Sequence, residues 1–354
     1  MTIDQKYIHR CIELAKMGAG YVAPNPMAGA VLVYKERIIG EGYHQQYGHA
    51  HAEVNCINSV REEDKNLINA STLYISLEPC VHYGKTPPCT DLIITNRIKK
   101  VIIGCLDPYK EVAGKGIEKL MASGISVITG ILEDECISLN KRFFIFHTKQ
   151  RPYIILKWAQ TANHKIAANG NERLLISNEY TNRLVHKWRS EEAAVMTGTN
   201  TALLDNPSLT TRFWKGNNAV RLIIDMNLRL PGHLTIFDAD STTIIFNNQK
   251  HTIDFNNTVN EINNGYYKIS EEKNILQQIM DACFRLNIQS ILIEGGAKLL
   301  QNFIDTGLWD EARVITNEKL IIAEGLAANA LQGERLTAAE NIFTDRINYY
   351  ERIE

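Results

Sequence analysis

The chain has 354 residues, of which 45% are apolar, and a formal net charge of −2. This length exceeds the roughly 150 residues typical of one domain, so two packed domains are expected. The near-neutral charge gives no electrostatic reason to expect a nucleic acid or a membrane as partner. The seven cysteines are scattered, which suits a reducing compartment, and charged residues interrupt the N-terminal segment where a signal peptide needs an apolar core. We therefore expect a cytoplasmic protein without a membrane span.

The first part of the chain alternates between helix and strand patterns. Ile8, Cys11, Ile12 and Ala15 recur at the spacing of an amphipathic helix. A hairpin is expected at 30–34 and 37–42, a helix from about 51, strands at 72–77, 101–105 and 125–129, and helices at 90–97 and 115–123. This order predicts a mixed sheet packed between helices, which is a three-layer α/β domain.

A polar segment at 147–152 ends in Pro152 and is the best boundary, which gives domains at 1–148 and 152–354. A second α/β series follows it. Strands are expected near 153–158, 193–198, 221–225, 242–246 and 290–294, and helices at 178–190, 275–287 and 297–305. Residues 247–274 are polar and rich in Asn, and they predict a surface loop with an irregular strand.

The most informative motif is His51-Ala52-Glu53, followed after 26 residues by Pro79-Cys80 and then by Cys89. Zinc favours four nitrogen and sulfur ligands, and a catalytic zinc keeps three protein ligands and one position for water. His51, Cys80 and Cys89 supply these three ligands. Their order is that of zinc-dependent deaminases of the cytidine type, although eight residues separate the cysteines here instead of two.

Hydrolytic deamination needs this combination of residues. Bound zinc lowers the pKa of its water to about 7, and Glu53 would take the proton and pass it to the departing amine. The alternatives are a structural zinc site, for which His82 could supply a fourth ligand, or cysteines that are only buried. The carboxylate of Glu53 beside His51 favours the open, catalytic site.

Four more stretches carry a resemblance to one family. They are Pro24-Asn25-Pro26 with Gly29, Glu41-Gly42-Tyr43-His44, Leu77-Glu78-Pro79-Cys80 with residues 84–89, and Asp107-Pro108 with residues 112–116. The chain resembles, over nearly its whole length, the bifunctional deaminase/reductase family of riboflavin biosynthesis, the RibD type. This resemblance implies a cytidine-deaminase-like N-terminal domain and a C-terminal domain similar to dihydrofolate reductase.

The resemblance also implies two activities and two cofactors. With Zn²⁺, the first domain would deaminate 2,5-diamino-6-ribosylamino-4(3H)-pyrimidinone 5′-phosphate. With NADPH, the second would reduce the ribosyl group of 5-amino-6-(5-phosphoribosylamino)uracil to ribityl. The partner is thus a small phosphorylated pyrimidine, and the sequence leaves a homo-oligomer open.

Three residues of the first domain are expected to bind the substrate. The amide of Asn25 suits a pyrimidinone edge, although Asn before Pro is also a common turn residue. His44 and Lys85 could pair with the substrate phosphate, or they could be plain surface residues. His49 is expected to form local hydrogen bonds and not to bind metal.

For the second domain, the resemblance implies the residue roles. Those that would hold the ribosyl phosphate are Lys157, Arg189, Leu209, Arg212 and Glu294, of which Lys157 is assigned to catalysis. Those that would face NADPH are Ala159, Leu175, Thr201, Asp205, Gly295 and Gly296. Backbone amides at a helix start can bind phosphate, but glycines also serve turn geometry alone, and Arg189 could merely complement a helix dipole.

The second domain departs from the family at two places. The usual Ser-x-Asp-Gly-Lys/Arg segment reads Thr161-Ala162-Asn163-His164-Lys165, and Leu175 replaces an aromatic residue. One alternative is therefore a deaminase whose second domain binds ligand but no longer reduces. Two others are a nucleic-acid deaminase, which would need a basic groove, and a structural zinc scaffold, which would have no use for Glu53.

Overall fold

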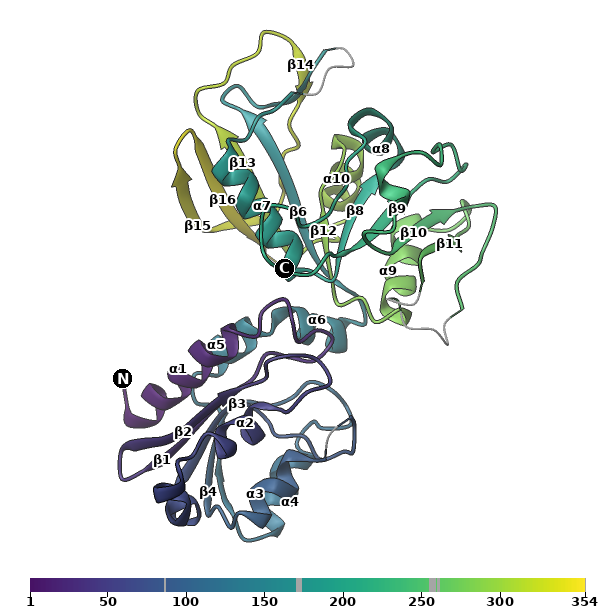
Figure 1. Ribbon diagram of the computed structural model, residues 1–354. Helices are drawn as coiled ribbons and strands as arrows, with labels where there is room; N and C mark the ends of the chain where they lie inside the picture. The colour runs from purple at the N-terminus through teal and green to yellow at the C-terminus, as the bar shows by residue number, and fades with distance from the viewer. Residues whose placement is uncertain (86, 170–173, 255–258, 260–261, 354) are drawn as a thin grey trace. The chain divides into compact units, whose positions relative to one another are not determined.

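The computed structural model describes residues 1–85, 87–169, 174–254, 259 and 262–353. The chain divides into two compact units, Met1–Lys149 and Gln150–Glu354 (Figure 1). In the part of the chain that is described, no helix is both long and apolar enough to cross a membrane.

The first unit places helices on both faces of a five-stranded sheet. Its elements are α1 (Ile3–Lys16), β1 (Gly29–Tyr34), β2 (Arg37–Tyr43), α2 (Ala52–Asn58), the 3-10 helix η1 (Glu62–Ala70), β3 (Thr72–Leu77), α3 (Cys89–Thr95), β4 (Lys100–Cys105), α4 (Lys115–Ala122), β5 (Ser126–Ile128), α5 (Glu133–Leu139) and α6 (Lys141–Lys149). The strand order is β2-β1-β3-β4-β5. β1 is antiparallel to β2 and β3, whereas β3, β4 and β5 are parallel.

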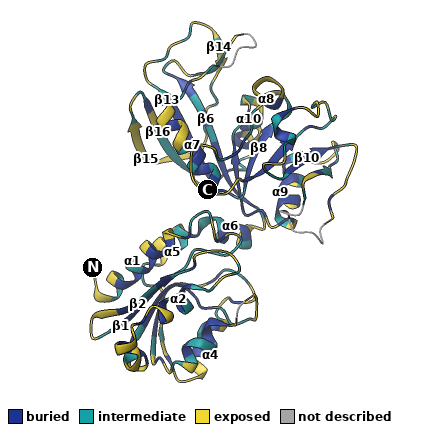
Figure 2. Ribbon diagram, viewed as in Figure 1, coloured by how far each residue is buried: buried dark blue, intermediate teal, exposed yellow. Residues whose placement is uncertain are grey.

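Strand periodicity explains the three layers, because successive side chains of a strand point to opposite faces. In β1, Ala30 and Leu32 pack into a core that includes residues of α2 and α3. Val31 and Val33 pack into a second core with α1 and α5. Dark blue in Figure 2 marks the buried residues of these strands. The three-layer α/β fold expected for this part of the sequence is confirmed.

The second unit is built on a nine-stranded sheet. Its elements are β6 (Tyr153–Thr161), β7 (Lys165–Ala168), α7 (Glu179–Glu191), β8 (Ala194–Gly198), α8 (Thr199–Asp205), β9 (Val220–Ile224), the 3-10 helix η2 (Thr235–Phe237), β10 (Thr243–Asn247), β11 (Asn264–Lys268), α9 (Ile275–Arg285), β12 (Ser290–Ile293), α10 (Ala297–Asp305), β13 (Glu311–Asn317), β14 (Gly325–Ala327), β15 (Glu334–Ile342) and β16 (Asp345–Arg352). The order β11-β10-β9-β8-β12-β6-β13-β16-β15 is parallel as far as β13, and β16 and β15 then run antiparallel.

Successive side chains of β6 point to opposite faces of the sheet, and one of these faces packs into the core of this unit. Leu156 and Trp158 belong to the main core, together with residues of α9 and α10. Lys157 lies between them in sequence and therefore points to the opposite face. Carboxyl ends of parallel strands gather at one edge of a sheet, where open α/β folds bind ligands.

Several elements differ from the sequence expectations. The strand near residues 264–268 is regular and parallel to β10, and helix α6 extends through the first part of the expected polar break to Lys149. The strands β13, β15 and β16 were not expected. The side chains of β15 are exposed at almost every position, so this strand carries no apolar alternation by which the sequence could reveal it.

Candidate active sites

The first unit brings His51, Cys80 and Cys89 together from three separate segments. His51 is the N-cap of α2, Cys80 lies in the loop after β3, and Cys89 is the first residue of α3. His51 Nδ1 lies 3.6 Å from Cys80 Sγ and 3.4 Å from Cys89 Sγ. All three ligand atoms lie within 4.8 Å of one another. Tetrahedral zinc with bonds of about 2.0–2.3 Å separates its ligand atoms by roughly 3.3–3.8 Å, so this donor set fits zinc.

Hydrogen bonds within this cluster favour the thiolate form of Cys80. The largest effect on Cys80 is a hydrogen bond with the Cys89 thiol, which, with the His51 ring, lowers the pKa of Cys80 to about 4. The backbone N–H of Cys89 also donates to Cys80 Sγ at 3.3 Å. A thiolate at Cys80 is the form that binds zinc.

Glu53 lies beside the cluster without belonging to it. It occupies the first turn of α2, is 4% exposed, and interacts electrostatically with His51 and Cys80. Burial raises the pKa of Glu53 above its ordinary value. A carboxyl group whose pKa lies nearer to neutrality exchanges protons more readily than an exposed one.

Among the described residues, His51, Cys80 and Cys89 form the one cluster of this kind, and His82 is not part of it. The His82 ring instead packs edge-on against Tyr109, with centroids 6.1 Å apart. The geometry therefore offers three protein ligands, as a catalytic zinc requires, and does not provide the fourth ligand of a closed structural site.

The predicted substrate residues of this unit lie in two different settings. His44 is buried, its ring lies 5.1 Å from that of His51, its Nδ1 is 3.0 Å from the carbonyl of Ala50, and its Nε2 is 3.2 Å from Asn25 Nδ2. Burial lowers the pKa of His44. Lys85, in contrast, is exposed, with Nζ 4.2 Å from the centre of the Tyr47 ring. Phosphate binding therefore remains a prediction for both, and Lys85 is the more available.

Sequence reasoning missed the structural part that Glu78 plays. Its buried carboxylate accepts backbone hydrogen bonds from Asp107 at 3.2 Å, Gly114 at 3.0 Å, Gly116 at 2.9 Å and Ile117 at 3.4 Å. Glu78 precedes Cys80 by two residues, so the 107–117 segment is fixed next to the cysteine ligand. A glutamate at the end of an apolar strand was the available signal, but its partners are distant in sequence.

In the second unit, Lys157, Arg189 and Glu294 form a partly buried charged cluster. Arg189 Nε and Nη2 lie 2.5 and 2.9 Å from the Glu294 carboxylate, and Lys157 Nζ lies 3.3 Å from it. Burial opposes ionisation of Glu294, but the charges of Arg189 and Lys157 outweigh it and lower the pKa to about 2. Glu294 is therefore a carboxylate at neutral pH and accepts hydrogen bonds.

A loop that follows α8 lies against this cluster. Arg189 Nη1 donates to the carbonyl of Thr210 at 3.2 Å, and Arg212 Nη1 donates to Thr210 Oγ1 at 3.0 Å. Leu209 is buried and has a φ of 53°. His186, which was not predicted, accepts a hydrogen bond from the backbone N–H of Arg212 at 3.0 Å. The structure thus brings Leu209 and Arg212 to the Lys157–Arg189–Glu294 cluster.

The residues predicted to face the cofactor surround the glycine turn after β12. A side chain at Gly295 would overlap Thr197, and Gly296, with a φ of 62°, begins α10 next to Thr201. Thr201 lies in α8 and Asp205 ends that helix with its side chain exposed. The turn therefore requires glycine at position 295 for close packing, and Gly296 is its exposed residue.

Ala159 and Leu175 are the other predicted cofactor residues. Ala159 lies in β6, two residues after Lys157, and is half-buried. Leu175 is 71% exposed, so its side chain is accessible. Its role in cofactor binding remains a prediction.

The unusual Thr161–Lys165 segment keeps a closed turn. The backbone N–H of His164 donates to the carbonyl of Thr161 at 2.9 Å, and His164 adopts a φ of 56° at the position where the family has glycine. Asn163 accepts a hydrogen bond from Thr161 Oγ1 and donates one to the carbonyl of Ile322. Side-chain hydrogen bonds thus hold the conformation that glycine would adopt freely.

Both units match families of known proteins. Residues 1–105 match the cytidine and deoxycytidylate deaminase zinc-binding region, and residues 152–326 match the RibD C-terminal domain. The riboflavin biosynthesis protein RibD of Aquifex aeolicus is 36% identical, with 99% of each chain covered. The RibD of Escherichia coli is 31% identical over 95% of this chain and 94% of its own length.

Solved structures agree with these matches. A diaminohydroxyphosphoribosylaminopyrimidine deaminase/5-amino-6-(5-phosphoribosylamino)uracil reductase from Thermotoga maritima matches with a TM-score of 0.87 and 34% identity, covering 99% of both chains. Acinetobacter baumannii RibD matches with a TM-score of 0.87 and 29% identity, again over 99% of both. This similarity over the whole length shows that the chain belongs to the RibD family of riboflavin biosynthesis proteins, with a cytidine-deaminase-like first unit and a reductase second unit.

Proposed function

We propose that the chain catalyses two successive steps of riboflavin biosynthesis. The first unit hydrolytically deaminates 2,5-diamino-6-ribosylamino-4(3H)-pyrimidinone 5′-phosphate. The second unit reduces the ribosyl group of 5-amino-6-(5-phosphoribosylamino)uracil with NADPH. The observation that carries this proposal is the zinc-compatible cluster of His51, Cys80 and Cys89 beside a buried Glu53, in a chain that is similar to RibD proteins from end to end.

For deamination, His51, Cys80 and Cys89 would hold the zinc ion. When bound, zinc makes water acidic enough to act as a nucleophile near neutral pH. Glu53 accepts a proton as the water oxygen bonds to the pyrimidine carbon and then delivers it to the amino nitrogen. The carbon–nitrogen bond breaks and ammonia leaves. The raised pKa of Glu53 suits a group that must both accept and donate the proton.

His44 supports this reaction best as a positioning residue for Asn25. A ring that donates from Nδ1 to Ala50 accepts from the Asn25 amide at Nε2, and this fixes which way the amide faces. Asn25 would then present its carbonyl oxygen to the pyrimidine. Lys85 is an exposed cation of this region and would pair with the phosphate as a point charge.

For reduction, the substrate needs a hydride and a proton. NADPH supplies the hydride when bound, with its phosphates near the backbone amides at Gly295 and Gly296. Glu294 is ionised and therefore cannot donate the proton while Arg189 and Lys157 stay paired with it. The ammonium group of Lys157 carries protons and is the better donor. Glu294 holds Lys157 in place and would accept a hydrogen bond from a substrate hydroxyl. Arg212 would bind the phosphate.

The experiment that tests this function incubates the purified, zinc-loaded chain with the diaminopyrimidinone phosphate, with and without NADPH. Ammonia release in both reactions, and NADPH oxidation that follows it, are expected. Ammonia release without any NADPH oxidation, even with the pre-deaminated substrate, would restrict the function to deamination. Absence of ammonia from a protein that contains zinc would overturn the proposal for the first unit.

A further inference from the structure

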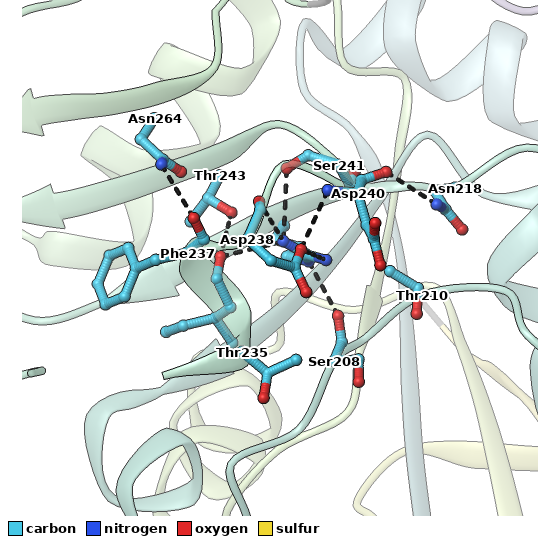
Figure 3. A network of polar contacts seen from close by, with 12 residues as sticks. Ser208, Thr210, Asn218, Thr235, Phe237, Asp238, Asp240, Ser241, Thr243 and Asn264 are labelled. Carbon is cyan, nitrogen blue, oxygen red and sulfur yellow. Dashed lines mark hydrogen bonds and ion pairs between the residues drawn. The ribbon is translucent and has the colours of Figure 1, made fainter. Parts of the chain in front are cut away.

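Arg221 in β9 is a buried charge with no part in the sites described above. It has no solvent exposure, and its guanidinium group joins two loops. Figure 3 shows Ser208, Asp238 and Ser241 of these loops close to one another. Nε donates to the carbonyl of Ser208 at 2.9 Å, and Nη2 contacts Asp238 Oδ1 at 2.7 Å. Nη1 donates to the carbonyls of Ile236 at 3.1 Å, Asp238 at 3.3 Å and Ser241 at 3.4 Å. A buried charge is tolerated only with partners of this kind.

Further hydrogen bonds fix the conformation of the loop that contains Asp238. Thr243 Oγ1 donates to the carbonyl of Ile236, and Ser241 Oγ donates to the carbonyl of Ala219 at 2.7 Å. Asp240 N–H donates to Asp238 Oδ1 at 3.1 Å. Arg221, which lies in β9, therefore connects Ser208 both to the sheet and to the hydrogen-bonded segment at 236–241.

Ser208 immediately precedes the loop that meets the charged cluster of the reductase unit. Leu209 has a φ of 53°, which is uncommon for a residue with a branched side chain. Such a conformation persists only when its surroundings hold it from both sides. On the C-terminal side, Thr210 and Arg212 are held by Arg189 and His186. On the N-terminal side, Arg221 holds Ser208.

We propose that Arg221 is a positioning residue for reduction, which sets Leu209, Thr210 and Arg212 for the ribosyl phosphate through its hydrogen bond to Ser208. This inference rests on the proposed reductase function. Arg221 is fully buried, so we assign it a positioning role and no direct contact with the substrate or the cofactor. It acts on substrate affinity because the loop that it anchors contacts Arg189 and carries Arg212.

The test replaces Arg221 by lysine, which keeps the charge but cannot bridge Ser208 and Asp238 with one ammonium group. Losing a charged hydrogen bond predicts a rise of roughly tenfold in KM for 5-amino-6-(5-phosphoribosylamino)uracil. KM for NADPH should change less than twofold, and deamination by the same protein should be unchanged. Arg335→Lys is the matched control, because Arg335 is exposed and pairs only with Glu351 among the contacts found for its side chain.

Two further measurements separate positioning from a general loss of structure. All four tryptophans lie in the second unit, so their fluorescence reports whether that unit folds in Arg221→Lys. Amide hydrogen exchange should increase at 208–212 and stay constant in β8. Equal losses of affinity for substrate and for NADPH, or an unchanged substrate KM in folded protein, would overturn the proposal.

Asp238→Asn decides the question if Arg221→Lys does not fold. This change removes the charge of the Asp238 carboxylate that pairs with Arg221. The hydrogen bonds of Arg221 to backbone carbonyls remain, so a smaller rise in substrate KM, about two- to fivefold, is expected. No rise would refute the role of Arg221. Failure of the wild-type chain to oxidise NADPH would instead refute the reductase function, and the exchange at 208–212 would still report whether Arg221 positions the loop.

Discussion

Glu78→Gln tests how the first unit holds its zinc ligands. The glutamate carboxylate accepts four backbone hydrogen bonds, two at each oxygen, from Asp107, Gly114, Gly116 and Ile117. Glutamine keeps one oxygen and turns an NH₂ group toward two backbone donors. One buried and one part-buried N–H group then lose their acceptor, at a cost of about 1–3 kcal/mol for the buried group and less for the other, so the unfolding free energy of this unit should fall by about 1–4 kcal/mol.

Urea unfolding followed by far-ultraviolet circular dichroism measures this change, and tryptophan fluorescence follows the second unit separately. Zinc affinity and deamination should fall with it, because Cys80 lies two residues from Glu78. Glu118→Gln is the matched control, since Glu118 is exposed in α4, and it should change stability by less than about 0.5 kcal/mol. A destabilisation below about 1 kcal/mol for Glu78→Gln, with full zinc content, would refute the reasoning.

Three more predictions address the two active sites. Glu53→Gln should lower deamination by about 10²–10⁴-fold while zinc stays near one ion per chain, measured by ammonia release and metal analysis; activity near wild type would remove Glu53 from the mechanism. Cys80→Ser should lose zinc and deamination but still reduce the deaminated substrate, and loss of both activities in folded protein would show that the units are coupled. The pKa of Glu294 is lowered to about 2 from an ordinary 4.5, so its ion pairs should stabilise the second unit fully above about pH 4.5 and progressively less as pH falls toward 2. Glu294→Gln should lack this pH step in denaturant unfolding followed by tryptophan fluorescence, and an equal step in both proteins would contradict the assignment.

The zinc cluster could be predicted from the sequence because its chemistry is local. His51 and Glu53 are two residues apart, and the cysteines follow in the order of a known family. The positions of Glu78 and Arg221 could not be predicted in this way. Glu78 bonds to residues 29–39 positions away, and Arg221 reaches back 13 positions to a carbonyl that has no side-chain signal.

The fold likewise contains elements that could be predicted from the sequence and elements that could not. Strands such as β1 and β6 alternate or bury their side chains, so their apolar patterns were visible in the sequence. β15 is exposed on both faces and is held by backbone pairing with β16. Helices α5 and α6 meet at Asn140, whose side chain bonds to the backbone of Met27. The polar composition of residues 147–149 predicted a linker, but these residues form the end of α6.

The most direct test of two chemistries in two separate units is a mixing experiment. Cys80→Ser lacks the zinc site, and Glu294→Gln lacks the carboxylate of the reductase cluster. Neither variant alone should convert the diaminopyrimidinone phosphate and NADPH to the deaminated ribityl product, as followed by mass spectrometry. The two proteins mixed in one tube should form it, because the product of one unit diffuses to the other. A mixture that forms no such product, although each variant retains its own remaining activity, would contradict the account.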